Sequence, residues 1–255
     1  MASLSAALLD SFKISDPAAF DAEMLRIRAQ MKGDPYRPVY HFLPPAGWFN
    51  DPNGPIYYKG QYHLFYQYSP RDAADRPVPK VWGHAVSDDM LYWKDLPIAL
   101  WADSPHDKGG VLSGNTFIDD EGNVRALYTG RAGVLDASAK LAINVSEKYG
   151  ILATSTDGMR TWTKKMVMDK HPYEGSPVHH DAQIWKDDGL WWQLIGGTWQ
   201  GKGTAVLWSS PDLENWTFRS RIYEPQRTGN YWELPYLLPY GDKDVLMYGR
   251  GTYWV

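Results

Sequence analysis

Two short patterns recur through the sequence and indicate its fold: GQYHLFY at residues 60–66 and AVSDDMLYW at residues 85–93. The first is a Gly or Asp turn followed by an apolar and aromatic run, and the second is a strand, a turn with Ser and Asp, and a tryptophan that begins another strand. The first pattern returns at residues 122–128, 189–195 and 244–249, and the second at residues 153–162 and 207–216. The two patterns alternate, so each unit is two hairpins, or four antiparallel strands.

The units repeat at a distance typical of propeller blades. The second pattern ends at Trp93, Trp162 and Trp216, which are 69 and 54 residues apart. Four-stranded units at this spacing indicate an all-β fold of the β-propeller type. The sequence holds three whole units and the first two strands of a fourth.

The incomplete fourth unit leaves an edge that a closed propeller would protect. We therefore expect either a fragment of a longer protein or a chain whose missing blades come from another chain. Self-association through unpaired propeller edges is expected in the second case.

Composition excludes several classes of protein. The chain has 255 residues, of which 44% are hydrophobic and 22% charged, and it has no cysteine. These values exclude a disordered chain, a disulfide scaffold and a thiolate metal site. A formal charge of −4 with scattered Lys and Arg argues against a nucleic-acid partner. The absence of a long uncharged apolar run argues against a membrane partner.

Residues 1–37 are expected to form an N-terminal extension before a catalytic propeller of residues 38–255. Asp16 and Pro17 are a helix-start signal, and Gly33 is a stop signal. Between them, apolar residues fall at helical spacing: Phe20, Met24, Ile27 and Met31. We predict one amphipathic helix packed outside the main domain. Residues 1–9 lack the basic start of a signal peptide, which favours a cytoplasmic protein.

Carboxylates open most of the inner strands. The first strand of each blade lines the channel of a propeller, so the residues that open these strands meet although they are far apart in sequence. Three of the four openings carry Asp51, Asp181 and Glu233, and the remaining one carries Asn115. Two carboxylates across a pocket can cleave a glycosidic bond, one as acid and the other as nucleophile or base. The third can stabilise positive charge that develops on the sugar ring.

Aromatic and polar neighbours of these carboxylates suit a sugar ligand. The 13 Trp and 17 Tyr fit both a β core and sugar stacking. Rings that could stack on a sugar lie beside the carboxylates at Trp48, Trp82 and Trp232. Donors and acceptors for hydroxyl groups are expected at Asn50, Gln67 and His84. The alternative for each residue is an ordinary strand position satisfied within the fold.

A metal site is not expected. His179, His180 and Asp181 are consecutive, and neighbouring residues in a strand point to opposite faces, so they cannot form one compact ligand set. No other feature calls for a cofactor.

The stretch HFLPPAGWFNDPNG at residues 41–54 is long and specific. It resembles the nucleophile motif of glycoside hydrolase family 32, which comprises invertases, inulinases, levanases and fructosyltransferases. LFYQYSP at 64–70, WGHAVSDD at 82–89 and LSG at 112–114 resemble the same family in the same order, over about residues 38 to 250. The resemblance adds Ser113 to the expected substrate-binding residues. It implies a five-bladed catalytic propeller, normally followed by a β-sandwich, and retaining hydrolysis or transfer of fructosyl groups.

The same resemblance implies a role for each carboxylate. Asp51 is expected to be the nucleophile that forms a covalent fructosyl-enzyme, Asp181 the transition-state stabiliser, and Glu233 the acid/base. His180 stands where the family has arginine, and it is expected to contact the substrate. Ala182 and Leu234 replace a proline and a cysteine. The expected substrate is a small molecule or an oligosaccharide, namely sucrose, inulin or levan.

Two other functions stay open. His180 favours a fructosyltransferase, or a furanosidase acting on another furanoside such as an arabinofuranoside. The ending in the middle of a unit favours an inactive partial propeller or a carbohydrate-binding fragment.

Overall fold

The computed structural model describes residues 17–38, 40, 42–70, 79–132, 147–169, 180–222, 231–250 and 253–254. One helix, α2 (Pro17–Met31), precedes the strands. The strands of the first half are β1 (Trp48–Tyr58), β2 (Gln61–Ser69), β3 (Val81–Ser87), β4 (Trp93–Leu100), β5 (Gly110–Ile118), β6 (Val124–Arg131), β7 (Lys148–Ser155) and β8 (Thr163–Met168). Those of the second half are β9 (His180–Asp187), β10 (Leu190–Trp199), β11 (Lys202–Ser210), β12 (Thr217–Ile222), β13 (Trp232–Tyr240), β14 (Lys243–Arg250) and β15 (Tyr253–Trp254).

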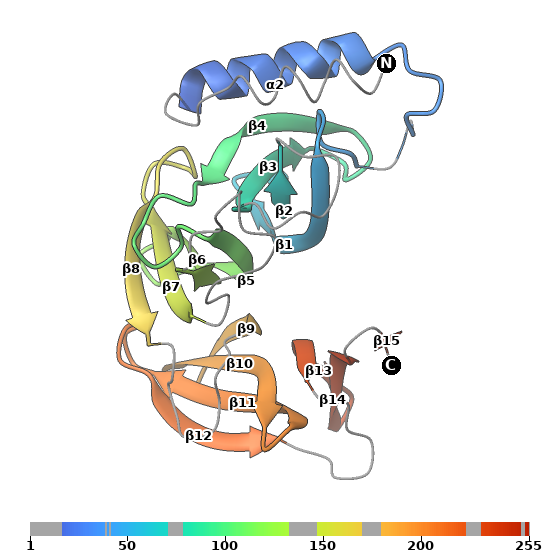
Figure 1. The fold of residues 1–255 in the computed structure, drawn as a ribbon. Coiled ribbons are helices and arrows are strands. Elements are labelled where there is room, and N and C mark those ends of the chain that lie inside the picture. Colours follow the sequence, from blue (N-terminus) through green and yellow to red (C-terminus); the bar gives the residue numbers. More distant parts are fainter. Residues whose placement is uncertain are drawn as a thin grey trace.

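The strands form four separate antiparallel sheets. Three sheets have four strands each in sequential order, β1 to β4, β5 to β8 and β9 to β12, and the fourth pairs β13, β14 and β15. Figure 1 shows the sheets in succession around a common centre, with β1, β5, β9 and β13 innermost. Consecutive inner strands contact each other. The predicted all-β propeller fold and its three whole units are therefore confirmed, and the fourth unit adds the short β15 to the two expected strands.

A hydrogen-bonded turn between the third and fourth strands explains the second sequence pattern. Ser87 Oγ donates to Asp89 Oδ1 at 3.1 Å, and the same carboxylate oxygen accepts the N–H groups of Leu91 and Tyr92. The arrangement recurs at Ser155–Asp157 and at Ser210–Asp212. Ser and Asp side chains bond their own backbone in turns, so the repeated sequence encodes a repeated local structure.

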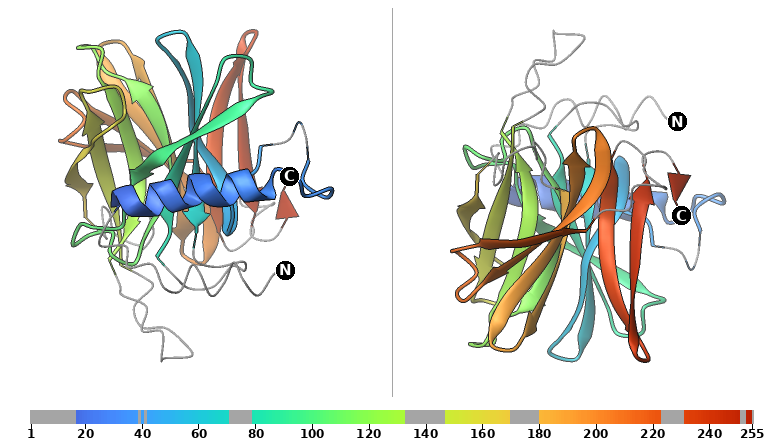
Figure 2. Two further views of the ribbon diagram at one scale, coloured as in Figure 1. Left: turned by 90° about the horizontal axis from the view of Figure 1, so that it is seen from above. Right: turned by 90° about the horizontal axis from the view of Figure 1, so that it is seen from below.

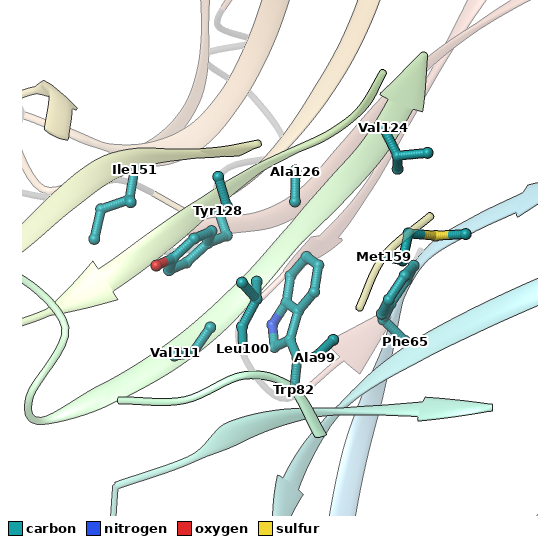
Figure 3. Packing of buried hydrophobic residues seen from close by; sticks show 11 residues of the cluster. Phe65, Trp82, Ala99, Leu100, Val111, Val124, Ala126, Tyr128, Ile151 and Met159 are labelled. Atoms are coloured by element: carbon teal, nitrogen blue, oxygen red, sulfur yellow. The ribbon is translucent and has the colours of Figure 1, made fainter. Parts of the chain in front are cut away.

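The largest group of buried side chains lies between the first and second sheets. It includes Phe65 and Trp82 from the first sheet and Val111, Tyr128 and Ile151 from the second (Figure 3). Large rings come close to the backbone where the neighbouring residue is glycine, since a Cβ at Gly83 would overlap the ring of Tyr66. Much of the Trp and Tyr excess therefore fills the core between sheets.

Helix α2 packs on the outside of the first sheet, as the sequence predicts. It lies across β4 in Figure 1, and the view from above in Figure 2 shows the same crossing. Met24 and Ile27 are buried in a cluster with Tyr66 and Tyr68, whereas Met31 is exposed. The side chain of Phe20 lies outside the described residues. In the part of the chain that the structure describes, no helix has the length and apolar character to cross a membrane.

A buried histidine pair lies inside the first sheet. His63 Nδ1 and His84 Nε2 are 3.0 Å apart, so one ring donates its N–H to the other, and His84 also stacks on Phe65 with ring centroids 4.4 Å apart. Burial, and secondarily the charge of His63, lowers the pKa of His84 to about 3, and burial lowers the pKa of His63. His84 is 3% exposed and satisfied within the sheet, so the expected contact with a sugar is not supported.

The repeated turn provides a matched pair of substitutions. Met90 and Met159 both have positive φ, 63° and 68°, but Met90 is 57% exposed and Met159 is 4% exposed. At such a φ, glycine avoids a backbone strain of about 1–2 kcal/mol. The greater conformational entropy of glycine in the unfolded chain opposes this gain by roughly 0.5–1 kcal/mol. Met90→Gly should therefore leave the free energy of unfolding unchanged or raise it by up to about 1 kcal/mol.

Met159→Gly should instead lower the free energy of unfolding by about 2 kcal/mol or more, because it removes a core side chain. Urea titrations of both variants and the parent chain measure the difference. Equal effects at the two positions would contradict this account of the turn.

The histidine pair predicts acid-sensitive stability. An unfolded histidine has a pKa of about 6.5, so below that pH the unfolded chain binds more protons than the folded one. The contribution of the two histidines to the free energy of unfolding is therefore fully present above about pH 6.5, and it is lost as the pH falls towards 3. His84 alone should account for a loss of about 2 kcal/mol between pH 7 and pH 5.

His84→Gln keeps an amide nitrogen for the bond to His63 and removes the titrating ring. Urea titrations at pH 5 and pH 7 should give a smaller pH difference for this variant than for the parent. All other titrating groups are common to both chains, so an identical pH difference would rule out His84 as the source.

Candidate active site

Each inner strand has an irregularity in its pairing at the end where the candidate residues lie. The register shifts between Phe49 and Pro52 in β1, between Val111 and Gly114 in β5, opposite Leu194 and Gly196 in β9, and between Glu233 and Tyr236 in β13. Such bulges turn a side chain away from the regular alternation of a strand. The displaced segments contain Asp51, Ser113, Asp181 and Leu234.

These segments meet at one cavity of about 380 Å³. Its walls come from all four inner strands, and the residues are Asp51, Pro52, Pro55, Gly114, Asp181, Ala182, Leu234 and Tyr236. Two of the three expected catalytic carboxylates thus line one cavity although 130 residues separate them in the sequence. Glu233 directly precedes Leu234, which lines the cavity, and the charge of Asp51 acts on Glu233.

Asp51 is half-buried and held through one of its two oxygens. Gln67 Nε2 donates to Asp51 Oδ2 at 3.0 Å, and Ser113 Oγ donates to the same oxygen at 2.6 Å. Gln67 also donates to Ser113, so the three side chains form a closed triangle. Gln67 and Ser113, which the sequence assigns to substrate binding, are 5% and 1% exposed. Their observed contact is with Asp51, and the result is a fixed orientation of its carboxylate.

Asp181 is buried on a strained backbone. It is 8% exposed with φ at +52°, and the N–H of Leu234, whose φ is +47°, donates to its carboxylate. A left-handed conformation outside glycine is uncommon and persists where the surroundings fix it. Burial, followed by the charges of Asp51 and Glu233, raises the pKa of Asp181 to about 7.

Glu233 is half-buried beside a residue of the core. Burial first, and then the charge of Asp51, raises the pKa of Glu233, while Lys148 acts in the opposite direction. A carboxyl group that keeps its proton at higher pH is suited to act as a general acid.

Two functional candidates were not expected from the sequence, Lys148 and Tyr236. Lys148 begins β7, the third strand of the second sheet, and its charge acts on Asp181 and Glu233. Tyr236 lines the cavity, and burial together with the charge of Asp181 raises its pKa. Lys148 lies outside every motif that carries the family resemblance, so no sequence signal pointed to it.

The burial of the tryptophans differs from what the sequence predicts. Trp82 is 0% exposed, and its Nε1 donates to the carbonyl of Leu112 at 2.9 Å. Trp232 is 1% exposed and stacks on Tyr248 with ring centroids 3.9 Å apart. Neither ring has a face open to a ligand, so sugar stacking by Trp82 or Trp232 is not supported and both belong to the core. Trp48 is half-buried, with Lys80 Nζ 4.3 Å from its ring centroid.

The remaining expected residues are described in part. Asn50 is half-buried in β1, and its buried Oδ1 has no hydrogen-bond partner within the described residues. His180 begins β9 opposite Gly196, but its side chain lies outside the described residues, as does His179. Within the described ranges, no group of three His, Asp or Glu residues is arranged to hold a metal ion.

Comparison with known proteins gives consistent matches over most of the chain. Residues 41–253 match the family model described as the N-terminal domain of glycosyl hydrolases family 32. A sucrose-6-phosphate hydrolase of Escherichia coli is 35% identical over 221 residues, which are 86% of this chain and 45% of that protein. A levanase of Bacillus subtilis is 37% identical over 207 residues, which are 78% of this chain and 28% of that protein.

A solved structure agrees with these matches. The β-fructofuranosidase of family GH32 from Bombyx mori superimposes with a TM-score of 0.73 at 32% identity, covering 91% of this chain and 48% of that one. The chain thus spans about half the length, or less, of these relatives. The matched region corresponds to the N-terminal domain of glycosyl hydrolases family 32. Because this match extends over most of its length, the chain belongs to glycosyl hydrolase family 32.

Proposed function

We propose that the protein is a retaining β-fructofuranosidase that cleaves sucrose or fructans through a covalent fructosyl-enzyme. The observation that carries the proposal is a cavity lined by Asp51 and Asp181, from two different sheets, and by Leu234, the residue after Glu233, from a third. Paired carboxylates of this kind are the apparatus of retaining glycosidases. Relatives support the substrate class, because a variant of the Bombyx mori β-fructofuranosidase was solved in complex with sucrose and superimposes with a TM-score of 0.74.

In the first step Asp51 is the nucleophile. Both hydrogen bonds that its carboxylate accepts within the described residues go to Oδ2, which leaves Oδ1 to attack the anomeric carbon. As that bond forms, the bond to the leaving oxygen breaks, and Glu233 transfers its proton to that oxygen. The raised pKa of Glu233 keeps this proton available.

In the second step Glu233 acts as a base. It removes a proton from water, whose oxygen attacks the anomeric carbon and releases Asp51 as a carboxylate. Ionised Asp181 would stabilise the positive charge on the ring in both steps. Asn50, Trp48 and His180 complete the proposed substrate contacts.

A second candidate is fructosyl transfer, or action on another furanoside. His180 at the start of β9 motivates it, since a histidine is only partly charged near neutral pH. Activity on sucrose, inulin, levan and arabinan distinguishes the substrates. Arabinan cleavage without fructan cleavage would favour the second candidate, and oligosaccharide products longer than the substrate would favour transfer.

Asp51→Asn should reduce the rate of fructose release by about 10³-fold or more, because the variant lacks the nucleophile. Asp242→Asn, in the exposed turn between β13 and β14, is the matched control and should keep the parent rate. In the parent reaction, methanol should trap the intermediate as the methyl β-fructofuranoside, with retained configuration. Full activity in Asp51→Asn would eliminate this assignment.

Glu233→Gln should be selective for the leaving group. Sucrose hydrolysis needs protonation of the departing oxygen and should fall by about 10²–10⁴-fold. Cleavage of p-nitrophenyl β-fructofuranoside to the fructosyl-enzyme should fall much less, because nitrophenolate leaves without a proton. Azide should then release β-fructosyl azide. Equal losses on the two substrates would argue that Glu233 is not the acid.

A further inference from the structure

The cavity between the carboxylates has an aromatic wall that the sequence did not predict. Trp82 and Trp232, two of the rings expected to stack on a sugar, are buried in the core. Among the described residues that line the cavity, only Tyr236 carries an aromatic ring, and it is 36% exposed. A tyrosine suits a contact that is apolar on its ring and polar at its hydroxyl group. Tyr236 is therefore the ring that this cavity offers to a ligand.

A bulge in β13 places Tyr236 at the cavity. The pairing of β13 with β14 shifts between Glu233 and Tyr236. After the shift, Leu237 packs against the buried cluster that contains Leu194 and Trp232. Neighbouring side chains in a strand point to opposite faces, so Tyr236 points away from this cluster. The proposed acid and the ring thus lie three residues apart on one irregular strand.

The amide group of Gln183 holds β13 against β9 at this point. Its Nε2 donates to the carbonyl of Leu237 at 3.0 Å, and its Oε1 accepts the N–H of Leu237 at 2.6 Å. These two bonds join strands that belong to different sheets. Gln183 is two residues after Asp181, and Leu237 directly follows Tyr236. The bonds therefore fix the backbone that carries Tyr236 beside the backbone that carries Asp181.

The hydroxyl group of Tyr236 contacts a third sheet. Asn115 Nδ2, from the one first-strand opening without a carboxylate, donates to Tyr236 Oη at 3.5 Å. Asn115 Oδ1 accepts the N–H of Thr116 at 2.9 Å, which directs the amide nitrogen to the tyrosine. Burial, and then the charge of Asp181, raises the pKa of Tyr236, so its hydroxyl group keeps its proton. Because Oη accepts the bond from Asn115, this proton can be donated to a ligand.

We propose that Tyr236 is a substrate-binding residue whose ring packs against a sugar ring and whose hydroxyl group donates to a sugar hydroxyl. The identity of the sugar, a fructoside, rests on the proposed function. Tyr236 takes no part in bond making or breaking, so it binds the substrate and the transition state alike. Losing such a contact raises KM and leaves kcat nearly unchanged.

Two substitutions separate the ring from the hydroxyl group. Tyr236→Leu removes both and should raise KM for sucrose by about tenfold or more, with kcat changed by less than about threefold. Tyr236→Phe keeps the ring, and its KM should lie between those of the parent and Tyr236→Leu. Tyr240→Leu is the matched control and should keep the parent KM, because Tyr240 lies on the same strand, is 77% exposed and does not line the cavity.

A purely structural role of Tyr236 predicts a different result. It would lower the fraction of active chain, and with it the apparent kcat, but would leave KM at the parent value. An unchanged KM in Tyr236→Leu would therefore overturn the proposal.

A second measurement does not depend on catalysis. Each substitution is combined with Asp51→Asn in the 255-residue chain, and sucrose binding is followed by ligand-observed NMR. The Kd of sucrose should rise in Tyr236→Leu by about the same factor as KM, and should not change in Tyr240→Leu.

The two readouts distinguish this proposal from the proposed function. Weaker sucrose binding in Tyr236→Leu, in a chain whose parent cleaves no fructoside, would support the contact and contradict the proposed function. Sucrose cleavage by the parent with unchanged KM and Kd in Tyr236→Leu would overturn the contact alone. A parent that neither cleaves nor binds sucrose would overturn both.

Discussion

The hydrogen bond from Trp82 Nε1 to the carbonyl of Leu112 joins the core between the first two sheets to the candidate site. The residue after Leu112 is Ser113, whose hydroxyl donates to Asp51. Two further bonds join the same strands: Thr116 Oγ1 to the carbonyl of Gly54 at 2.5 Å and the N–H of Gly114 to Asn53 Oδ1 at 3.3 Å. The position of the proposed nucleophile therefore depends on how two sheets pack, which no single strand determines.

A second constraint is electrostatic. Burial and the negative charge of Asp51 both raise the pKa of Asp181 and the pKa of Glu233. The backbone holds Asp181 and Leu234 at positive φ, which a regular strand would avoid. Packing of the inner strands stabilises these two backbone conformations, although each of them costs free energy locally. The site thus holds groups of like charge in fixed positions, and its protonation state depends on the ionisable groups around it.

Local patterns made the sheets predictable from the sequence. Serine and aspartate turns such as Ser87–Asp89 depend on neighbours within a few residues, so the repeats identified whole units. The carboxylates followed from their place at the openings of first strands. The burial of Trp82 could not be predicted, because every residue of β3 is buried and alternation carries no information there. Lys148 also could not be found, since the effect of Asp181 on its pKa arises only when separate sheets come together.

The candidate residues come from separate sheets, and residues close in sequence form the turns of each sheet. Tyr128 packs against Trp82, with ring centroids 5.7 Å apart, and its hydroxyl donates to the buried Asp107. Tyr128 does not line the cavity, yet it packs between the sheet that carries Asp51 and the sheet that carries Ser113. A substitution at such a core position can therefore change how Ser113 meets Asp51 without altering either residue.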